Sequence, residues 1–166
     1  MGHSTHTLDE LVGMLRGHGV AAIVDVRTVP RSRRVPQFNA ETLPSALKKA
    51  GIEYFHLKAL GGLRKTHADS PNTGWRNASF RGFADYMQTP EFSAGLDELI
   101  AIASERPAAI MCAEAVPWRC HRSLIGDAIL VRGWQVMDIM STSSARPHEM
   151  TPFARVRGRK ITYPPE

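Results

Sequence analysis

The sequence predicts a single-domain α/β protein with a mainly parallel sheet and helices on both faces. Three observations predict it: continuous apolar runs of strand length, amphipathic segments between them, and crossovers of about ten or more residues, which parallel strands require. The chain of 166 residues fits one domain with a buried core, and no repeat or linker divides residues 1–166. We therefore expect a Rossmann-like three-layer arrangement.

Apolar periodicity divides the chain into alternating helices and strands. Thr7 and Glu10 have the spacing of a capping box, and the apolar residues that follow recur at helical intervals. Unbroken apolar runs that end in polar residues predict buried parallel strands. The expected helices cover residues 7–18, 40–50, 80–88, 91–106 and 120–132, and the expected strands cover residues 21–26, 53–57, 108–113 and 135–139.

Two regions depart from this alternation. Residues 58–81 are polar and glycine-rich without clear periodicity, and a loop of this length in a compact domain is usually functional or disordered. Near the C-terminus, Gly158 and Arg159 are flanked by alternating residues. This pattern predicts a C-terminal hairpin within residues 153–163.

The charge balance favours an anionic partner. The formal net charge is +5, and 16 of the 21 basic residues are arginine. A guanidinium group binds carboxylates and phosphates through two parallel hydrogen bonds. The arginine content therefore favours an anionic small molecule or a nucleic acid as the partner. The alternative is that the arginines only form a solvated surface. No segment approaches the roughly 20 apolar residues that cross a bilayer, and no apolar signal region opens the chain. We therefore expect a cytoplasmic protein without a membrane partner.

Polar residues follow two of the expected strands at their carboxyl ends. Asp25 and Arg27 end one strand, and Cys112 ends another. In open α/β sheets, ligands bind beyond the carboxyl ends of the strands. We therefore expect the segments Asp25–Arg34 and Cys112–Arg122 to face one crevice, which would be the working site.

The segment Cys112–Arg122 contains the residue types of a catalytic site. Its last four residues open a helix, and the N-terminus of a helix binds anions and lowers the pKa of nearby thiols. The catalytic candidates are Cys112 as nucleophile, Glu114 as a general acid or base if burial raises its pKa, and His121. In the structural alternative, Cys112 is only a buried strand residue and Glu114 forms an ion pair with Arg122.

Arginine and amide side chains supply the expected anion site. The planar guanidinium groups would clamp a phosphate or carboxylate, and the amides would orient it. The alternative is a basic surface loop that Asp25 anchors, and His3 is also expected to reach the crevice. The expected anion-binding residues are Asp25, Arg27, Arg31, Arg34, Gln37, Asn39, Arg119, Cys120 and Arg122.

The long loop adds a different kind of binding group. Trp75, Arg76 and Asn77 bring aromatic, guanidinium and amide groups together. This mixture suits the stacking of a base or ring together with phosphate contacts. A lid without ligand contacts is the alternative.

Two other interpretations of the cysteines stay open. Cys112, Cys120 and His121 could ligate a metal ion, but their spacing is not a standard zinc pattern, and we expect no metal site. Cys112 and Cys120 could form a reversible disulfide if a curled loop brought their Cα atoms within about 7 Å. In a cytosolic chain we expect both to be reduced. The sequence identifies neither a cofactor nor an oligomeric state.

Several motifs of the chain occur together in one family. They are Gly2-His3-Ser4-Thr5, Val24-Asp25-Val26-Arg27 with Pro30-Arg31-Ser32, Pro36-Gln37-Phe38-Asn39, Leu60-Gly61-Gly62, residues 72–86, and Cys112-Ala113-Glu114 through Cys120-His121-Arg122. In this combination the chain resembles the domain of unknown function 488 family over nearly its whole length. The resemblance implies an uncharacterised α/β domain. It also implies a strand ahead of Gly2, so we expect the first strand to be missing or truncated and a sheet edge to be exposed.

A weaker similarity is to the rhodanese layout, in which a cysteine thiolate lies in a short loop closed by an arginine. The shared features are an aspartate and an arginine after an early strand and Cys112 at a later strand end. Rhodanese and phosphatase loops place the arginine closer to the cysteine than here, where Arg119 and Arg122 follow Cys112 by seven and ten residues. This spacing argues against a cysteine-based sulfur or phosphoryl transfer.

The leading hypothesis is an enzyme that acts on an anionic substrate, either nucleotide-like or a nucleic acid. Cys112 or Glu114 would perform the chemistry, and the arginines would hold the substrate. The alternatives are a non-catalytic nucleic-acid-binding module, a small-molecule sensor without turnover, and rhodanese-like sulfur transfer by Cys112.

Overall fold

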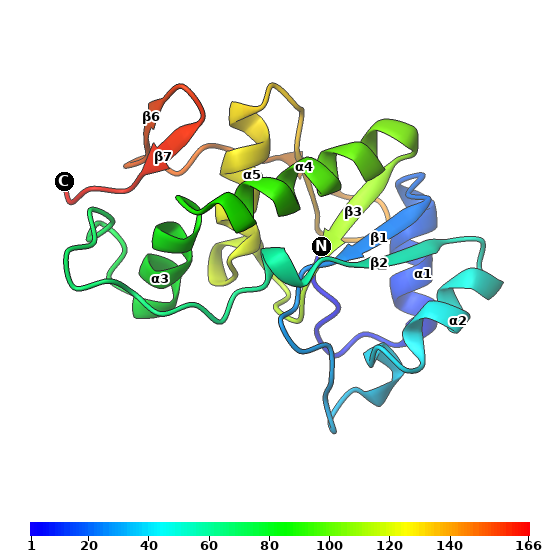
Figure 1. Ribbon diagram of the computed structural model, residues 1–166. Coiled ribbons are helices and arrows are strands. Elements are labelled where there is room, and N and C mark those ends of the chain that lie inside the picture. Colours follow the sequence, from blue (N-terminus) through cyan, green and yellow to red (C-terminus); the bar gives the residue numbers. More distant parts are fainter.

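The computed structural model describes residues 1–166 and contains a parallel sheet of three strands (Figure 1). β1 (Ala22–Asp25) lies between β2 (Glu53–His56) and β3 (Ala108–Met111), and both neighbours run parallel to it. All three strands lie within the expected ranges. The α/β class and the parallel sheet are therefore confirmed.

Five α-helices accompany the sheet: α1 (Leu8–Gly17), α2 (Leu43–Lys49), α3 (Ala78–Tyr86), α4 (Pro90–Glu105) and α5 (Arg122–Val131). The capping box of α1 is confirmed, because Thr7 and Glu10 exchange side-chain and backbone hydrogen bonds. The last helix begins at Arg122 rather than Cys120, since the 3-10 turn η3 (Pro117–Arg119) leaves Cys120 extended. None of the helices combines the length and apolar character needed to cross a bilayer.

The two faces of the sheet carry separate hydrophobic clusters. Successive strand residues point to opposite faces. Accordingly, Ile23 packs with residues of α1 and α2, whereas Val24 packs with residues of α3, α4 and α5. Figure 1 shows the first two helices on one side of the sheet and the other three on the opposite side.

The remaining strands form two separate antiparallel pairs. β4 (Met137–Ile139) pairs with β5 (Ala145–Pro147), and β6 (Arg155–Arg157) pairs with β7 (Lys160–Thr162). The C-terminal hairpin is confirmed, and Gly158 in its turn has a φ of +62°. The strand expected at residues 135–139 is shorter and lies outside the parallel sheet. A Rossmann-like three-layer arrangement is therefore not confirmed.

The first residues of the chain run beside the end of β3. Gly2 forms a parallel bridge with Cys112, and the N–H groups of His3 and Ser4 donate to carbonyl groups of Cys112 and the following residue at 2.9 Å. A Cβ at position 2 would lie 1.5 Å from the Glu114 carbonyl oxygen, so this close approach requires glycine. The N-terminal segment therefore reaches the carboxyl end of the sheet, where it pairs through one bridge to Cys112 and does not form a full strand.

A buried carboxylate organises the long loop ahead of α3. Asp85 accepts hydrogen bonds from Ser70 Oγ at 2.5 Å, Asn72 Nδ2 at 2.7 Å and the His67 N–H at 2.9 Å. Burial raises the pKa of Asp85, but these hydrogen bonds outweigh it and hold the pKa below its usual value. The loop is therefore ordered by one side chain rather than by regular structure.

His148 joins α5 to β4. Its Nε2 lies 3.0 Å from Asp127 Oδ1, and its Nδ1 lies 3.3 Å from Asp138 Oδ2. The hydrogen bonds to Asp127 and Asp138 raise the pKa of His148 from 6.5 to about 9. A histidine pKa that is raised in the folded state stabilises the fold fully below the unfolded pKa, and this contribution is lost as pH rises through the folded pKa.

We predict that His148 contributes up to about 3 kcal/mol to the free energy of unfolding at pH 6.5 and below, and that this contribution is lost as pH rises to about 9. Because the lowered pKa of Cys112 changes stability in the opposite sense above about pH 7, the contribution is measured as the difference between the wild-type chain and His148→Gln at each pH. Urea unfolding followed by circular dichroism at a series of pH values measures this difference. His67→Gln changes an exposed histidine and should give no such pH-dependent difference; a difference for His148→Gln that does not shrink toward pH 9 contradicts the assignment.

Candidate functional site

A cavity of about 710 Å³ lies at the carboxyl ends of β1 and β3. The N-terminal segment, the loop after β1 and the segment after β3 all border it, so the two segments expected to share a crevice do meet. Its volume is typical of small-molecule sites, which span about 300–1,000 Å³. The expected site residues that line it are Arg27, Arg31, Arg34, Cys112, Glu114, Arg119, Cys120 and His121.

A buried ion pair shapes one wall of this cavity. Asp25 is fully buried and accepts hydrogen bonds from Arg27 Nη2 at 2.7 Å, Arg27 Nε at 2.9 Å and the Tyr54 hydroxyl at 2.5 Å. Burial and the bond to Asp25 raise the pKa of Tyr54. Arg27 also donates to the Phe38 carbonyl at 2.6 Å, and its Nη1 lies 3.3 Å from His3 Nε2. Asp25, expected to bind ligand, lies outside the cavity lining and anchors the loop instead.

Two buried thiols border the cavity. Cys112 and Cys120 are free and only 3% and 4% exposed. The hydrogen bond from the Cys120 thiol lowers the pKa of Cys112 to about 7; burial opposes this shift, and the charge of Arg122 supports it. The same hydrogen bond and burial raise the pKa of Cys120. The pair therefore loses its first proton more readily than an isolated thiol does.

His121 connects the thiol pair to the sheet. Its Nε2 lies 2.9 Å from the Val26 carbonyl oxygen, and its Nδ1 lies 3.5 Å from Cys120 Sγ. Because a carbonyl only accepts, Nε2 carries the proton and Nδ1 is the acceptor that faces Cys120. Burial lowers the pKa of His121, which favours this neutral form. A Cβ at Gly62 would lie 2.7 Å from His121 Nδ1, so glycine leaves room for the ring.

Arg122 and Glu114 differ from their expected positions. Arg122 is buried outside the lining of this cavity, and its Nη2 donates to the Glu114 carbonyl oxygen at 2.9 Å rather than to the carboxylate. The Glu114 side chain is exposed, so it lacks the burial that a role as general acid requires. Arg122 acts on the site through its charge, which favours the Cys112 thiolate.

Gln37 and Asn39 shape the arginine-rich loop and do not line the cavity. Gln37 Nε2 donates to the His6 carbonyl at 3.1 Å, and Asn39 Oδ1 accepts from the Ser32 N–H at 2.7 Å. The Asn39 bond is a local one of the kind that asparagine often makes, whereas the Gln37 bond joins the loop to the N-terminal segment. Their role as hydrogen-bonding partners of a ligand stays a prediction.

Three side chains of the long loop, Trp75, Arg76 and Asn77, also lie outside the cavity lining, whereas Leu63 and Phe80 border it. Trp75 packs against Phe80 and Phe153, with ring centroids 5.0 and 4.9 Å apart. Asn77 caps α3, because its side chain accepts from the first N–H groups of the helix. Arg76 is exposed. The indole is therefore part of an aromatic cluster rather than an open stacking platform.

Hydroxyl side chains also line the cavity; Ser4, Thr5 and Ser32 belong to the motifs that carry the family resemblance, but no binding role was predicted for any of the hydroxyl residues. They are Ser4, Thr5, Thr28, Ser32 and Ser79. Ser4 has a φ of +45°, a left-handed conformation that is uncommon outside glycine and is found at functional sites. Serine and threonine in loops are ordinarily turn residues, so their types carry no signal of this role.

The metal interpretation of the cysteines gains no support from the geometry. No three His, Cys, Asp or Glu side chains are grouped so that they could hold a metal ion. Instead, Cys120 lies next to both Cys112 and His121 Nδ1, and its single thiol proton can be donated to only one of them at a time. These groups can stabilise a thiolate and accept a proton.

We predict that alkylation of Cys112 by iodoacetamide reaches half its maximal rate near pH 7. Cys120→Ala removes the thiol donor and should move the half-point toward the value of about 8.5 for a free thiol. Cys120→Ser keeps a donor and should preserve the low value. Timed alkylation with peptide mass spectrometry measures each half-point, and an unchanged half-point in Cys120→Ala would refute the role of the pair.

Comparison with known proteins identifies the family. No curated protein and no solved structure matches the chain. The family model described as "Domain of unknown function DUF488" matches residues 7–129, which include the loop after β1 and the segment after β3 that border the cavity. That description assigns no activity. Because the match covers most of the 166 residues, the chain belongs to the DUF488 family, as its motifs indicated.

Proposed function

We propose that the protein is an enzyme that uses Cys112 as a nucleophile on a small anionic substrate bound in the 710 Å³ cavity. The observation that carries the proposal is the thiol pair, in which the pKa of Cys112 is lowered to about 7, at the border of an arginine-rich cavity. The thiolate is the nucleophilic form of cysteine, and enzymes activate it by lowering its pKa.

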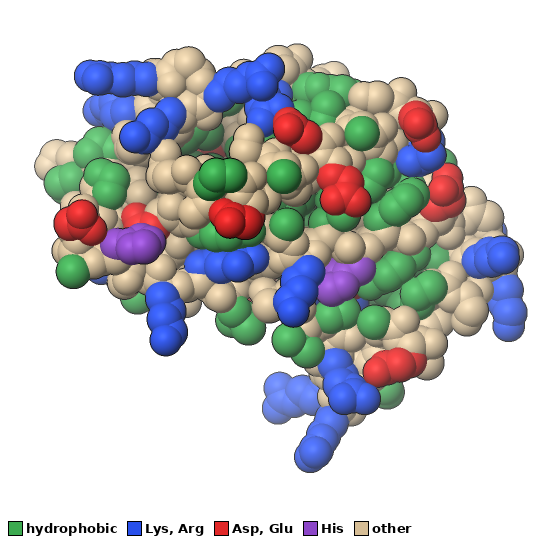
Figure 2. Space-filling view, viewed as in Figure 1, with side chains coloured by type: hydrophobic (Ala, Val, Ile, Leu, Met, Phe, Trp, Pro, Cys, Tyr) green, Lys and Arg blue, Asp and Glu red, His purple; other side chains and the backbone are tan.

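Exposed arginines would attract the substrate. Arg31, Arg34 and Arg119 border the cavity and are exposed. The ion pair of Arg31 with Glu41 is 73% and 61% exposed, so it contributes little and leaves Arg31 available. In Figure 2 basic side chains gather at the lower tip of the molecule, where Figure 1 has the loop after β1, and at the upper left, where the β6–β7 hairpin lies. A positive field at the cavity would raise the local concentration of anions.

The thiol pair suits group transfer through a covalent intermediate. The Cys112 thiolate would attack an electrophilic sulfur or phosphorus atom, forming an S–S or S–P bond while the leaving group departs with its electron pair. A second nucleophile would then attack the transferred group and restore the thiolate. His121 Nδ1, 3.5 Å from Cys120 Sγ, would hold a proton during the cycle.

Of these two reactions the loop favours sulfur transfer, although Arg119 and Arg122 follow Cys112 at a longer spacing than the arginine of rhodanese loops. Phosphoryl transfer depends on donors arranged around several charged oxygens. Here the Glu114 N–H donates to the Cys112 thiol, but Arg122 donates to the Glu114 carbonyl and lies outside the cavity lining, so it is not directed at a bound anion. A sulfane sulfur atom needs fewer such donors.

A non-catalytic nucleic-acid-binding role is the main alternative. The same arginines would serve it, and binding would weaken steeply with salt. Stacking of a base, which was expected of Trp75 in that role, needs an exposed ring face. Trp75 is instead packed against Phe80 and Phe153. We therefore favour a small anionic substrate.

Incubation with thiosulfate or with p-nitrophenyl phosphate tests the proposal. We expect a covalent adduct on Cys112, detected by intact-mass spectrometry, that Cys112→Ser abolishes and Cys120→Ser retains. A mass gain of one sulfur atom identifies sulfur transfer, and a gain of one phosphoryl group identifies phosphoryl transfer. If neither class of substrate leaves an adduct, the proposed group transfer is wrong.

Removal of two cavity arginines should weaken substrate binding. For Arg31→Ser with Arg34→Ser we predict a rise in KM of roughly fivefold, about 1 kcal/mol, with kcat unchanged, because exposed charges act on binding rather than on the reacting bond. The matched control is Arg155→Ser with Arg157→Ser, which removes the same charge from the exposed β6. Equal effects of the two double variants would show that net charge, and not the site, governs KM.

A further inference from the structure

Cys112 and Cys120 come from different elements and border the same cavity. Cys112 follows β3, whereas Cys120 lies between the turn η3 and α5. Both residues belong to one hydrophobic cluster, and the Cys120 thiol lies next to the Cys112 thiol. The proposed transfer uses Cys112 as the nucleophile and gives the sulfur atom of Cys120 no reaction of its own. The cavity therefore holds a second thiol within reach of the first.

Arg122 holds the two cysteine-bearing segments together. Its backbone N–H donates to Cys120 Sγ at 3.4 Å, and its Nη2 donates to the Glu114 carbonyl oxygen at 2.9 Å. The Glu114 N–H in turn donates to the Cys112 thiol. Two cysteines can be joined only where their side chains face each other at short range. These contacts hold the two sulfur atoms side by side, so the pair meets that requirement with little movement.

The groups around Cys120 favour its ionisation once Cys112 has reacted. In the free pair, the hydrogen bond to Cys112, burial and the negative charge of Cys112 all raise the pKa of Cys120. Once Cys112 carries a transferred atom, its own sulfur is no longer charged. The charge and the N–H of Arg122 still lower the pKa of Cys120, and His121 Nδ1, 3.5 Å from Cys120 Sγ, can accept the proton. The pair therefore reacts in a fixed order, Cys112 first and Cys120 second.

We propose that Cys120 is the resolving cysteine of this site, which attacks Cys112 once Cys112 carries a transferred sulfur atom and forms an intrachain disulfide with it. The inference rests on the proposed function for the source of that sulfur. With thiosulfate, the Cys112 thiolate attacks the outer sulfur atom, and sulfite leaves with the electron pair of the broken S–S bond. Cys112 then carries a persulfide.

The second step releases sulfide. Cys120 gives its proton to His121 Nδ1, and its sulfur attacks Cys112 Sγ. The bond between Cys112 Sγ and the outer sulfur breaks, and the outer sulfur leaves with that electron pair and takes the proton from His121, as hydrosulfide. Each cysteine sulfur loses one electron, and the transferred sulfur gains two. An external dithiol then reduces the disulfide, so the complete cycle reduces sulfane sulfur and oxidises a dithiol.

Timed incubation of the protein with thiosulfate, without added thiol, tests the second step. In the wild-type chain we expect the gain of one sulfur atom to give way to the loss of two hydrogen atoms, with release of sulfide. Peptide mass spectrometry without reductant should find Cys112 joined to Cys120, and dithiothreitol should restore both thiols. In Cys120→Ser the sulfur adduct should persist, and the release of sulfide should be lost.

A matched control changes the same segment and keeps both thiols. Ser123→Ala removes the hydroxyl group that donates to the Cys120 carbonyl oxygen at 3.1 Å. This variant should still form the disulfide and release sulfide, because no sulfur atom is lost. Circular dichroism of Cys120→Ser and Ser123→Ala checks that both variants fold like the wild-type chain.

Hydrogen peroxide tests the resolving role without sulfur transfer. The Cys112 thiolate attacks one peroxide oxygen and hydroxide leaves, which converts Cys112 to a sulfenic acid; Cys120 then attacks Cys112 Sγ, and water leaves as the disulfide forms. A disulfide with peroxide, but no adduct with thiosulfate in Cys120→Ser, supports the resolving role and contradicts the proposed sulfur transfer. If neither reagent produces the intrachain disulfide, the resolving role is wrong, whether or not thiosulfate leaves an adduct.

Discussion

The buried ion pair between Asp25 and Arg27 fixes the carboxyl end of the sheet, on which the rest of the site depends. Burying two charges is costly, and such a pair persists only where further hydrogen bonds satisfy it. Here Tyr54 from β2 and the Phe38 carbonyl supply those bonds. One cluster therefore ties β1, β2 and the arginine-rich loop together, and the loop that it holds becomes a wall of the first cavity.

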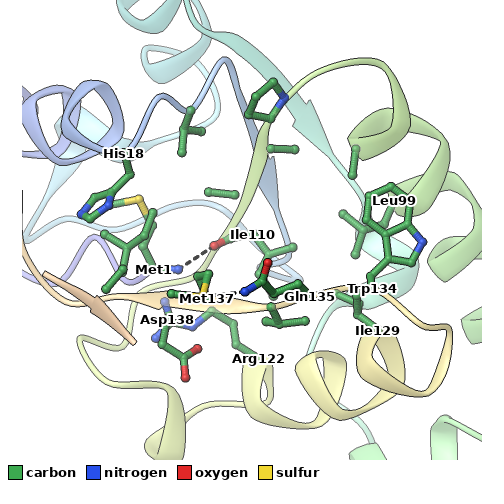
Figure 3. Close-up of a pocket in the computed structure, with 18 of the residues that line it drawn as sticks. Met1, His18, Leu99, Ile110, Arg122, Ile129, Trp134, Gln135, Met137 and Asp138 are labelled. Atoms are coloured by element: carbon green, nitrogen blue, oxygen red, sulfur yellow. Dashed lines mark hydrogen bonds between the residues drawn. The ribbon is translucent and has the colours of Figure 1, made fainter. Parts of the chain in front are cut away.

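Arg122 has a comparable role on the other side of the thiols. It is the first residue of α5 and is almost completely buried. Its charge supports the Cys112 thiolate, and its side chain lines a second, mostly apolar cavity of about 420 Å³ that Met1 also borders (Figure 3). A buried cation beside a thiol needs no contact with the substrate to influence reactivity, because Coulomb interactions are weakly screened in the interior.

Most of the framework was predictable because its signals are local. The capping box at Thr7, the three apolar strands and the turn at Gly158 each depend on a few neighbouring residues. The meeting of the two polar strand ends was predictable as well, since parallel strands present their carboxyl ends at one edge of the sheet. β4 was misplaced because its apolar residues indicate a strand but do not identify its partner, which is β5 and not a strand of the main sheet.

The sequence by itself determined which segments meet at the sheet end and which residue types they bring there. Only the tertiary structure decided which side chains face the cavity. Asn77 became a helix cap, Trp75 joined an aromatic cluster, and Arg122 turned to a different cavity. The reason is physical: a side chain takes its direction from partners distant in sequence, as His121 does from the carbonyl of Val26, 95 residues away.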